Sequence, residues 1–362
     1  MRLLLIAILI HTTCFSQVND SLLYQLQQIE NDTEKVNQLY KTGFDLRNTD
    51  PQFSYDFAIA CEKAALKSKS PKHLAKSYNL FGIIFYKKGD YIKALNFQKQ
   101  ALALNQSIQN ETGAAINLTN LGNIYSDIHY LALSEQSYLQ ALHAYNKTNN
   151  TIQISRCLLN IGVLKYTQKQ FNAAIKQFEQ ALYFADKIGD HDLIASCYNN
   201  IGTILREQNK PDSALMYLEE SLKIRQQSDN EVELADSYNN IANVYILLKN
   251  FNQASNYISM AQEIGEKYGY AEALLEVYHT RSLFYEAQRD FQQANTWLKK
   301  HYVLKDSLQI IEKENLDFTF QNETSYDETS GLELKHGSNN WLLIFLLLML
   351  IALPLFLIRY KR

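Results

Sequence analysis

The chain has 362 residues, and its 35 basic side chains nearly balance its 38 acidic ones, which gives a formal net charge of −3 at pH 7. The charges are mixed along the sequence, so no basic stripe is present to hold nucleic acid. The sequence also contains none of the short motifs for phosphate, zinc or acyl-transfer chemistry. We therefore expect no enzyme, no cofactor and no metal site.

Residues 1–16 are predicted to be a signal peptide. One positive charge at Arg2 is followed by an apolar run from Leu3 to Ile10, and the small residue Ser16 precedes polar sequence. Eight apolar residues are too few to span a bilayer as a helix. We expect cleavage after Ser16, and Cys14 leaves lipidation open as an alternative.

Residues 34–74 are predicted to form a divergent first repeat unit, and residues 75–312 six units of 40 residues. The 40-residue period appears in two series of small residues. One series consists of Gly82, Gly122, Gly162, Gly202, Ala242 and Ser282, and the other of Ala94, Ser134, Ala174, Ala214, Ala254 and Ala294. Two series with one period indicate an array of stacked units in which neighbours bury each other's apolar faces.

Each 40-residue unit is predicted to be a helical hairpin. In the unit that begins at Ala75, the apolar residues recur at steps of three, four and seven, which places them on one face of each of two helices. The segment 87–90 contains a glycine and breaks the helical pattern between them. We interpret the small residues as points where the two helices of a hairpin approach closely.

This pattern resembles the tetratricopeptide repeat. The resemblance rests on Leu158, Ile161, Gly162, Lys165, Ala174, Phe178 and Ala181 in one unit, and on Tyr198, Ile201, Gly202, Leu205, Ala214, Leu218 and Ser221 in the next. The 40-residue length is similar to the variety found in kinesin light chains and in the periplasmic sensor half of bacterial membrane signalling proteins of the histidine kinase or regulator type. The resemblance implies an all-α fold, a right-handed superhelical solenoid of about seven hairpins.

The C-terminal residues predict a membrane anchor. Residues 313–340 are polar and are interpreted as a tether, and residues 341–358 carry no charge over a length that can cross a bilayer. The basic residues of the segment 359–362 predict a cytoplasmic tail. Together with a cleaved signal peptide, this predicts a single-pass inner membrane protein with its repeats in the periplasm.

Three cysteines remain beyond the predicted signal peptide, namely Cys61, Cys157 and Cys197. Cys157 and Cys197 occupy equivalent positions in adjacent units, and neighbouring packed helices lie about 8–10 Å apart. A disulfide needs Cα atoms within about 7 Å. We therefore favour three buried thiols over a disulfide, while intermolecular linkage stays open.

The family resemblance implies that the first helix of each unit lines a partner-binding groove. The candidate groove residues are Asn79, Tyr86, Asn123, Tyr166, Asn199, Arg206, Asn239 and Asn243. An asparagine side chain both donates and accepts hydrogen bonds, so a row of them can hold an extended peptide. The alternative is a solvated surface. A separate series, Asn120, Asn160, Asn200 and Asn240, is expected to bond to the backbone of neighbouring helices.

Two functions follow from these predictions. The first is a membrane-anchored scaffold or adaptor that binds a protein or an extended peptide in the periplasm. The second is the sensory input subunit of a split or degenerate two-component-type system, with a membrane kinase or regulator as partner, because the short predicted tail leaves no room for an output domain. An enzyme ranks third, and nucleic acid is not expected as a partner.

Overall fold

The computed structural model describes residues 21–47, 50–227 and 231–308. The chain divides into two units, Met1–Ile311 and Glu312–Arg362, and the second lies outside the described residues. The predicted signal peptide (1–16), tether (313–340), transmembrane segment (341–358) and tail (359–362) also fall outside them. Among the helices of the described residues, none combines the length and the apolar character needed to span a bilayer.

The described residues form helices, with no strand among them, and they alternate as the first and second helices of successive hairpins. We call the first helices A helices: α2 (Asp32–Leu46), α4 (Pro71–Lys87), α6 (Glu111–Asp127), α8 (Thr151–Thr167), α10 (His191–Glu207), α12 (Glu231–Leu247) and α14 (Ala271–Ala287). The second are the B helices: α3 (Pro51–Ser68), α5 (Tyr91–Ser107), α7 (Leu131–Lys147), α9 (Phe171–Ile188), α11 (Pro211–Arg225), α13 (Phe251–Tyr268) and the helical residues 291–308. The predicted all-α repeat array is confirmed.

The predicted break between the two helices of a unit is also confirmed, since α4 ends at Lys87 and α5 begins at Tyr91. Residues with positive φ recur every 20 positions along the described connections: Lys69, Gly89, Gln109, His129, Asn149, Lys169, Gly189, Asn209, Lys249, Gly269 and Arg289. A left-handed residue after the last helical turn closes the helix, because the amide groups that follow bond back to it. In the connection after α4, the amides of Gly89 and Asp90 donate to Tyr86 and Phe85 at 3.0 and 2.9 Å.

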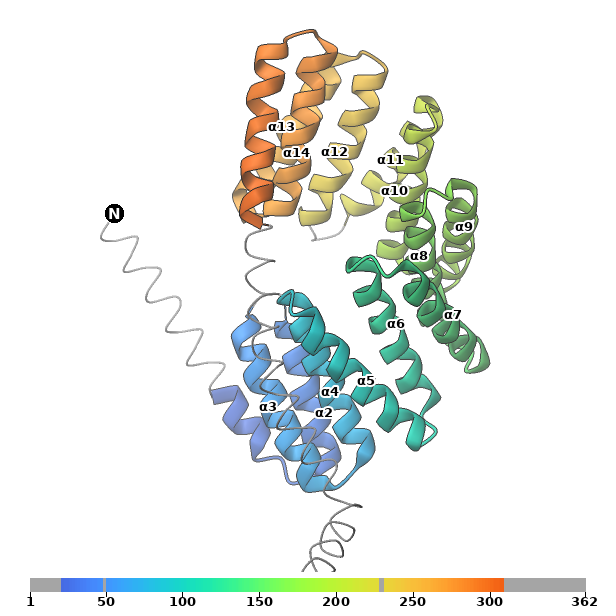
Figure 1. The fold of residues 1–362 in the computed structure, drawn as a ribbon, viewed down its shortest axis with the longest axis vertical. Helices are drawn as coiled ribbons and strands as arrows, with labels where there is room; N and C mark the ends of the chain where they lie inside the picture. Colours follow the sequence, from blue (N-terminus) through green and yellow to red (C-terminus); the bar gives the residue numbers. More distant parts are fainter. Residues whose placement is uncertain (1–20, 48–49, 228–230, 309–362) are drawn as a thin grey trace, which may run out of the picture. The chain divides into compact units, whose positions relative to one another are not determined.

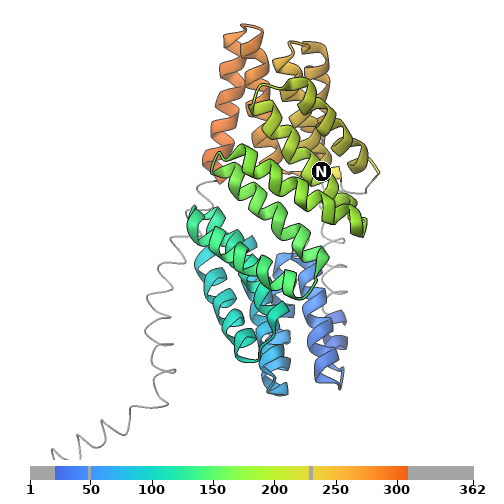
Figure 2. The same ribbon diagram turned by 90° about the vertical axis from the view of Figure 1, so that its right-hand side faces the viewer.

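Neighbouring hairpins stack in chain order (Figures 1 and 2). Each A helix contacts the A helix of the next hairpin, whereas no two of the B helices α3, α5, α7, α9, α11 and α13 contact each other. Neighbouring A helices are therefore closer together than neighbouring B helices. This packing gathers the A helices into a row with a shared surface, which we call the A-helix face.

The small-residue series lies where A and B helices cross within a hairpin. A Cβ atom at Gly82, Gly122 or Gly162 would approach the side chain 16 residues later to 2.5 Å, and one at Gly202 would approach Leu218 to 2.7 Å. Side chains cannot overlap at such distances, so these positions exclude a methyl group unless the facing side chain moves. The second series is fully buried at Ala94, Ser134, Ala174, Ala214 and Ala254. The steric role predicted for the small residues agrees with these distances.

The three cysteines are free and fully buried, which confirms the prediction for them. The Cys157 thiol donates to the carbonyl oxygen of Tyr138 at 3.3 Å. Burial raises the pKa of each thiol to about 12. Because the thiolate is the reactive form of cysteine, these side chains serve packing rather than chemistry.

The structure also contains one helical segment that the sequence pattern did not predict. Residues 21–27 are helical, and Leu22, Leu23 and Leu26 pack against the core of the first hairpin beside Val36 and Leu39. Three leucines within five residues follow helical spacing. This segment covers one apolar side of the hairpin formed by α2 and α3.

Candidate functional site

The candidate groove residues all lie on A helices, from α4 to α12. Successive residues of one A helix at steps of three and four, such as Asn199, Thr203 and Arg206 of α10, follow one side of that helix. Because neighbouring A helices contact one another, equivalent positions form rows across the A-helix face. The structure shows how each candidate side chain in these rows is engaged.

Asn79 of α4 is buried, with 6% of its surface exposed. Its side-chain nitrogen donates to the Tyr40 hydroxyl at 2.9 Å, and its side-chain oxygen accepts from Asn117 at 3.2 Å and from Asn120 at 2.8 Å. These bonds join α2, α4 and α6, so this amide satisfies buried polar groups between neighbouring A helices.

Asn123 and Asn199 take part in the same kind of contact. The Asn123 oxygen accepts from the Tyr138 hydroxyl at 2.7 Å and from Asn160 at 3.1 Å, and the Asn199 oxygen accepts from Asn240 at 3.1 Å. Each asparagine donor lies on the next A helix along the chain. Neighbouring A helices are therefore joined by amide-to-amide hydrogen bonds.

These contacts correct the expectation for the second asparagine series. Asn120, Asn160 and Asn240 donate to side-chain oxygens of the preceding A helix, not to its backbone. Asn200 donates to the Ser196 carbonyl of its own helix at 2.8 Å. The acceptors are side chains rather than backbone because Asn79, Asn123 and Asn199 present their amide oxygens to these donors from the preceding A helix.

Asn239 and Asn243 lie one turn apart on α12. Asn243 donates to the Asn239 carbonyl and to the Thr280 hydroxyl of α14, both at 2.9 Å. Asn239 is buried, and its side-chain oxygen is without a hydrogen-bond partner among the described residues. Asn243 thus links α12 to α14 and continues the pattern of polar contacts between A helices.

The two candidate tyrosines make equivalent contacts two repeats apart. Tyr86 donates from its hydroxyl to Asp127 at 2.6 Å, and Tyr166 donates to Glu207. Burial raises the pKa of Tyr86, and the bond to Asp127 raises it further. Burial, followed by the hydrogen bond to Glu207, raises the pKa of Tyr166 to about 12. Both phenols are therefore neutral hydrogen-bond donors near pH 7.

A cleft of about 570 Å³ opens on the A-helix face between α10, α12 and α14. It is lined by Arg206, Asn243, Ile246, Leu247, Glu276, His279, Thr280, Leu283, Glu286 and Ala287. Three consecutive A helices contribute side chains, as expected of a surface formed by a stack rather than by one hairpin. The cleft is large enough to accept several side chains of a partner.

Of the eight candidate residues, the structure brings Arg206 and Asn243 into this cleft and leaves the other six outside its lining. The other eight lining residues, Glu276 and Leu247 among them, were not candidates from the sequence. Glu276 stands three residues before His279 and therefore on the same side of α14. This three-residue spacing could have identified Glu276 from the sequence, because it places Glu276 one turn before His279 on the side of α14 that lines the cleft.

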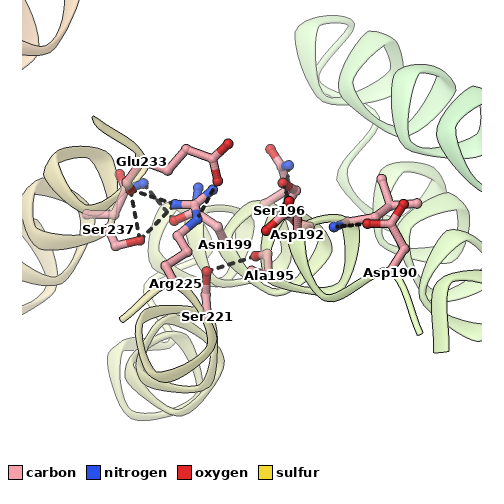
Figure 3. A network of polar contacts seen from close by, with 12 residues as sticks. Asp190, Asp192, Ala195, Ser196, Asn199, Ser221, Arg225, Glu233 and Ser237 are labelled. Atoms are coloured by element: carbon pink, nitrogen blue, oxygen red, sulfur yellow. Dashed lines mark hydrogen bonds and ion pairs between the residues drawn. The ribbon is translucent and has the colours of Figure 1, made fainter. Parts of the chain in front are cut away.

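A buried arginine joins α11 to the start of α12 (Figure 3). Arg225 of α11 is 6% exposed, and its guanidinium donates to the Ser237 hydroxyl at 2.7 Å and to the Glu233 carbonyl at 3.1 Å. Its Nε atom lies 3.3 Å from a carboxylate oxygen of Glu233. Burial lowers the pKa of Arg225, and the charges of Glu233, Asp236 and Asp192 oppose that effect. The network fixes the start of α12 against α11.

Within the described ranges, no group of three or more His, Cys, Asp and Glu side chains is placed to hold a metal ion. The polar groups of the A-helix face are amides, hydroxyls and separate charges. Such groups can hydrogen-bond a peptide backbone or pair with a charged side chain.

Comparison with known proteins identifies the repeat. Two models of the tetratricopeptide repeat match the chain, one at residues 153–227 and the other at residues 75–108 and 235–264. No curated protein sequence matches the chain.

Several solved structures share the fold. A Rap protein complexed with competence and sporulation factor is 15% identical, with a TM-score of 0.60, over 87% of this chain and 92% of that one. NprR in complex with its cognate peptide NprX is 16% identical, with a TM-score of 0.58, over 88% and 94%. The Rap conjugation gene regulator of plasmid pLS20, in complex with the Phr* peptide, is 16% identical, with a TM-score of 0.54, over 76% and 96%. At these identities the likeness is one of fold.

Proposed function

Because the chain is a member of the tetratricopeptide-repeat family, we propose that it is a membrane-anchored scaffold whose A-helix face binds an extended segment of a partner protein. The observation that carries this proposal is the cleft lined by α10, α12 and α14, which combines apolar side chains with separate charged groups. Peptide complexes of NprR and of the pLS20 regulator, which share the fold, add support for an extended peptide as the bound group.

The proposed location is the inner membrane, with the repeats in the periplasm. It is supported by sequence features alone: the apolar run in residues 1–16, the uncharged segment 341–358 and the basic residues of the segment 359–362. In this arrangement the partner would be a periplasmic protein or the periplasmic part of a membrane protein.

The experiment compares matched leucine substitutions in the full chain. Leu247 lines the cleft and is 47% exposed, and Leu139 is 51% exposed on the B helix α7. After crosslinking in cells, we expect a captured partner with the unaltered protein and with Leu139→Ser, and its loss with Leu247→Ser. A partner retained equally by both variants would refute binding at this cleft, and far-UV circular dichroism should show both variants folded.

The second candidate is a sensory input subunit that pairs with a membrane kinase or regulator. It is favoured by one fold neighbour, the conjugation gene regulator of plasmid pLS20 in complex with a peptide. Exchange of residues 341–358 for an unrelated apolar segment distinguishes the two candidates. A scaffold keeps its captured partner after the exchange. For an input subunit, the exchange should abolish the same cellular response that is lost when the whole chain is deleted.

A further inference from the structure

The charges of the cleft are divided between its two sides. Arg206 lies on α10, whereas Glu276 and Glu286 lie on α14. Arg206 and Glu276 both act on the pKa of Tyr166, in opposite directions, so both charges stand within electrostatic reach of that hydroxyl. The cleft thus presents a positive edge and a more strongly negative edge to a bound segment.

The carboxylates of this region differ in how they are engaged. Glu207, next to Arg206, accepts the hydrogen bond from Tyr166 and lies 3.7 Å from the Lys169 ammonium. Glu276 and Glu286 are exposed, and neither forms an ion pair or a side-chain hydrogen bond with another described residue. Two carboxylates are therefore open to a cation from a partner.

Apolar side chains lie between these charges. Ile246 and Leu247 of α12 and Leu283 of α14 line the cleft together with Ala287. Leu247 remains 47% exposed although it is a large aliphatic residue. Contact with an aliphatic group of a partner would remove this apolar surface from water, which is favourable.

One A helix nearer the start of the array, α4, has the opposite charge. Helix α4 carries Lys72, Lys76 and Lys87 and no acidic residue, whereas α14 carries Glu272, Glu276 and Glu286. The one basic residue of α14, Arg281, has its guanidinium 4.8 Å from the Trp297 ring centre on the following B helix, away from the cleft lining. An acidic segment would find its complement near α4, and a basic segment near α14.

We infer that the cleft between α10, α12 and α14 binds a basic, aliphatic segment of a partner, with a lysine or arginine paired to Glu276 or to Glu286, which lie about 15 Å apart along α14. The neighbouring aliphatic side chain of that segment contacts Ile246, Leu247 and Leu283, and the Arg206 guanidinium donates to a carbonyl oxygen of the extended backbone. This inference rests on the proposed function and adds to it the chemistry of the bound segment.

The test measures fluorescence anisotropy of a short labelled peptide, with one lysine between two leucines in a serine background, titrated with the full chain. Removal of both open charges in Glu276→Gln with Glu286→Gln should weaken binding by about tenfold or more, the equivalent of about 1.4 kcal/mol. The matched control, Glu219→Gln with Glu220→Gln on the B helix α11, removes two exposed carboxylates outside the cleft and should leave binding unchanged. Added salt should weaken binding to the unaltered protein.

Two further probes decide between outcomes. One replaces the lysine by glutamate and the other replaces both leucines by serine, and both should bind more weakly than the original. Equal or tighter binding of the glutamate probe, equal effects of the two glutamine pairs, or no binding of the lysine probe would each overturn the inference. The proposed function is decided separately, because the loss of a crosslinked partner in Leu247→Ser does not depend on which probe binds.

Discussion

The crossing of α8 and α9 provides a quantitative prediction about what the small residues do. A Cβ atom on Gly162 would lie 2.5 Å from Cε1, 2.6 Å from Cδ1 and 3.0 Å from Cζ of the Phe178 ring. Favourable carbon contacts need about 3.5 Å or more, so the ring must move by roughly 1 Å. Such overpacking costs about 1–3 kcal/mol.

Gly162→Ala also has a favourable effect, because alanine is preferred over glycine inside a helix by about 1 kcal/mol. The net expectation is a loss of about 1 kcal/mol in the free energy of unfolding, within a range of about 0–2 kcal/mol. The sixth hairpin offers a compatible pair, since Ala242 and Ile258 occupy the equivalent positions and both are buried. Phe178→Ile should therefore make room for the alanine.

The assay is a double-mutant cycle of Gly162→Ala and Phe178→Ile, followed by urea unfolding and far-UV circular dichroism. Because a repeat array does not unfold as one unit, hydrogen exchange of α8 and α9 should accompany the midpoints. We expect a favourable coupling of about 1–2 kcal/mol between the two substitutions. As a control, Gly189→Ala, which has positive φ and no neighbour within 4 Å, should destabilise the protein without coupling to Phe178→Ile. A coupling of zero, or an increase in stability from Gly162→Ala alone, would refute the steric explanation.

Three other predictions concern buried or paired groups. The Cys197 thiol, whose pKa burial raises to about 12, should resist iodoacetamide at pH 8 until urea unfolds the chain, and rapid labelling of the folded protein would contradict its burial. Arg225→Met should lower the free energy of unfolding by about 2 kcal/mol, because it removes the ion pair with the Glu233 carboxylate and leaves the Glu233 carbonyl and the Ser237 hydroxyl without their donor; an unchanged urea midpoint would refute this. The Lys165 ammonium, 2.6 Å from Glu135, holds the pKa of that carboxyl below its usual range. Glu135 thus stabilises the fold above its unfolded pKa and loses this effect as pH falls through its folded pKa, so Lys165→Met should reduce stability at neutral pH and the difference should disappear in acid.

The architecture was predictable because each repeat provides an independent copy of the same information. The period predicted the positions of the six hairpins after the divergent first unit, and the break at 87–90 recurs between the helices of later units. The identity of the small residues also predicted where helices cross, since Gly122 and Gly162 face rings that leave no space for a side chain. Helix 21–27 escaped prediction because it precedes the repeats and is too short for its period to stand out.

The binding face was predictable only in part. An asparagine at an inner position can bond to a ligand, to solvent or to its neighbour, and the sequence does not distinguish these choices. In the structure, the side chains of Asn79 and Asn199 accept hydrogen bonds from asparagines of the next A helix. The burial of Arg225 was also not predictable from the sequence, because an arginine is usually exposed. Only the packing of α10, α11 and α12 reveals it. The cleft itself depends on three helices from separate repeats.

The left-handed residues that close the helices at intervals of 20 positions limit how this protein can change in length. One residue inserted within an A helix would rotate every later side chain of that helix by about 100° and turn the bonded asparagines away from their partners. Insertion of a whole unit instead adds one hairpin, whose A helix extends the A-helix face by one helix. The spacing of residues within the other hairpins stays unchanged. The length of the A-helix face therefore changes by gain or loss of entire 40-residue units, each of which adds or removes one A helix.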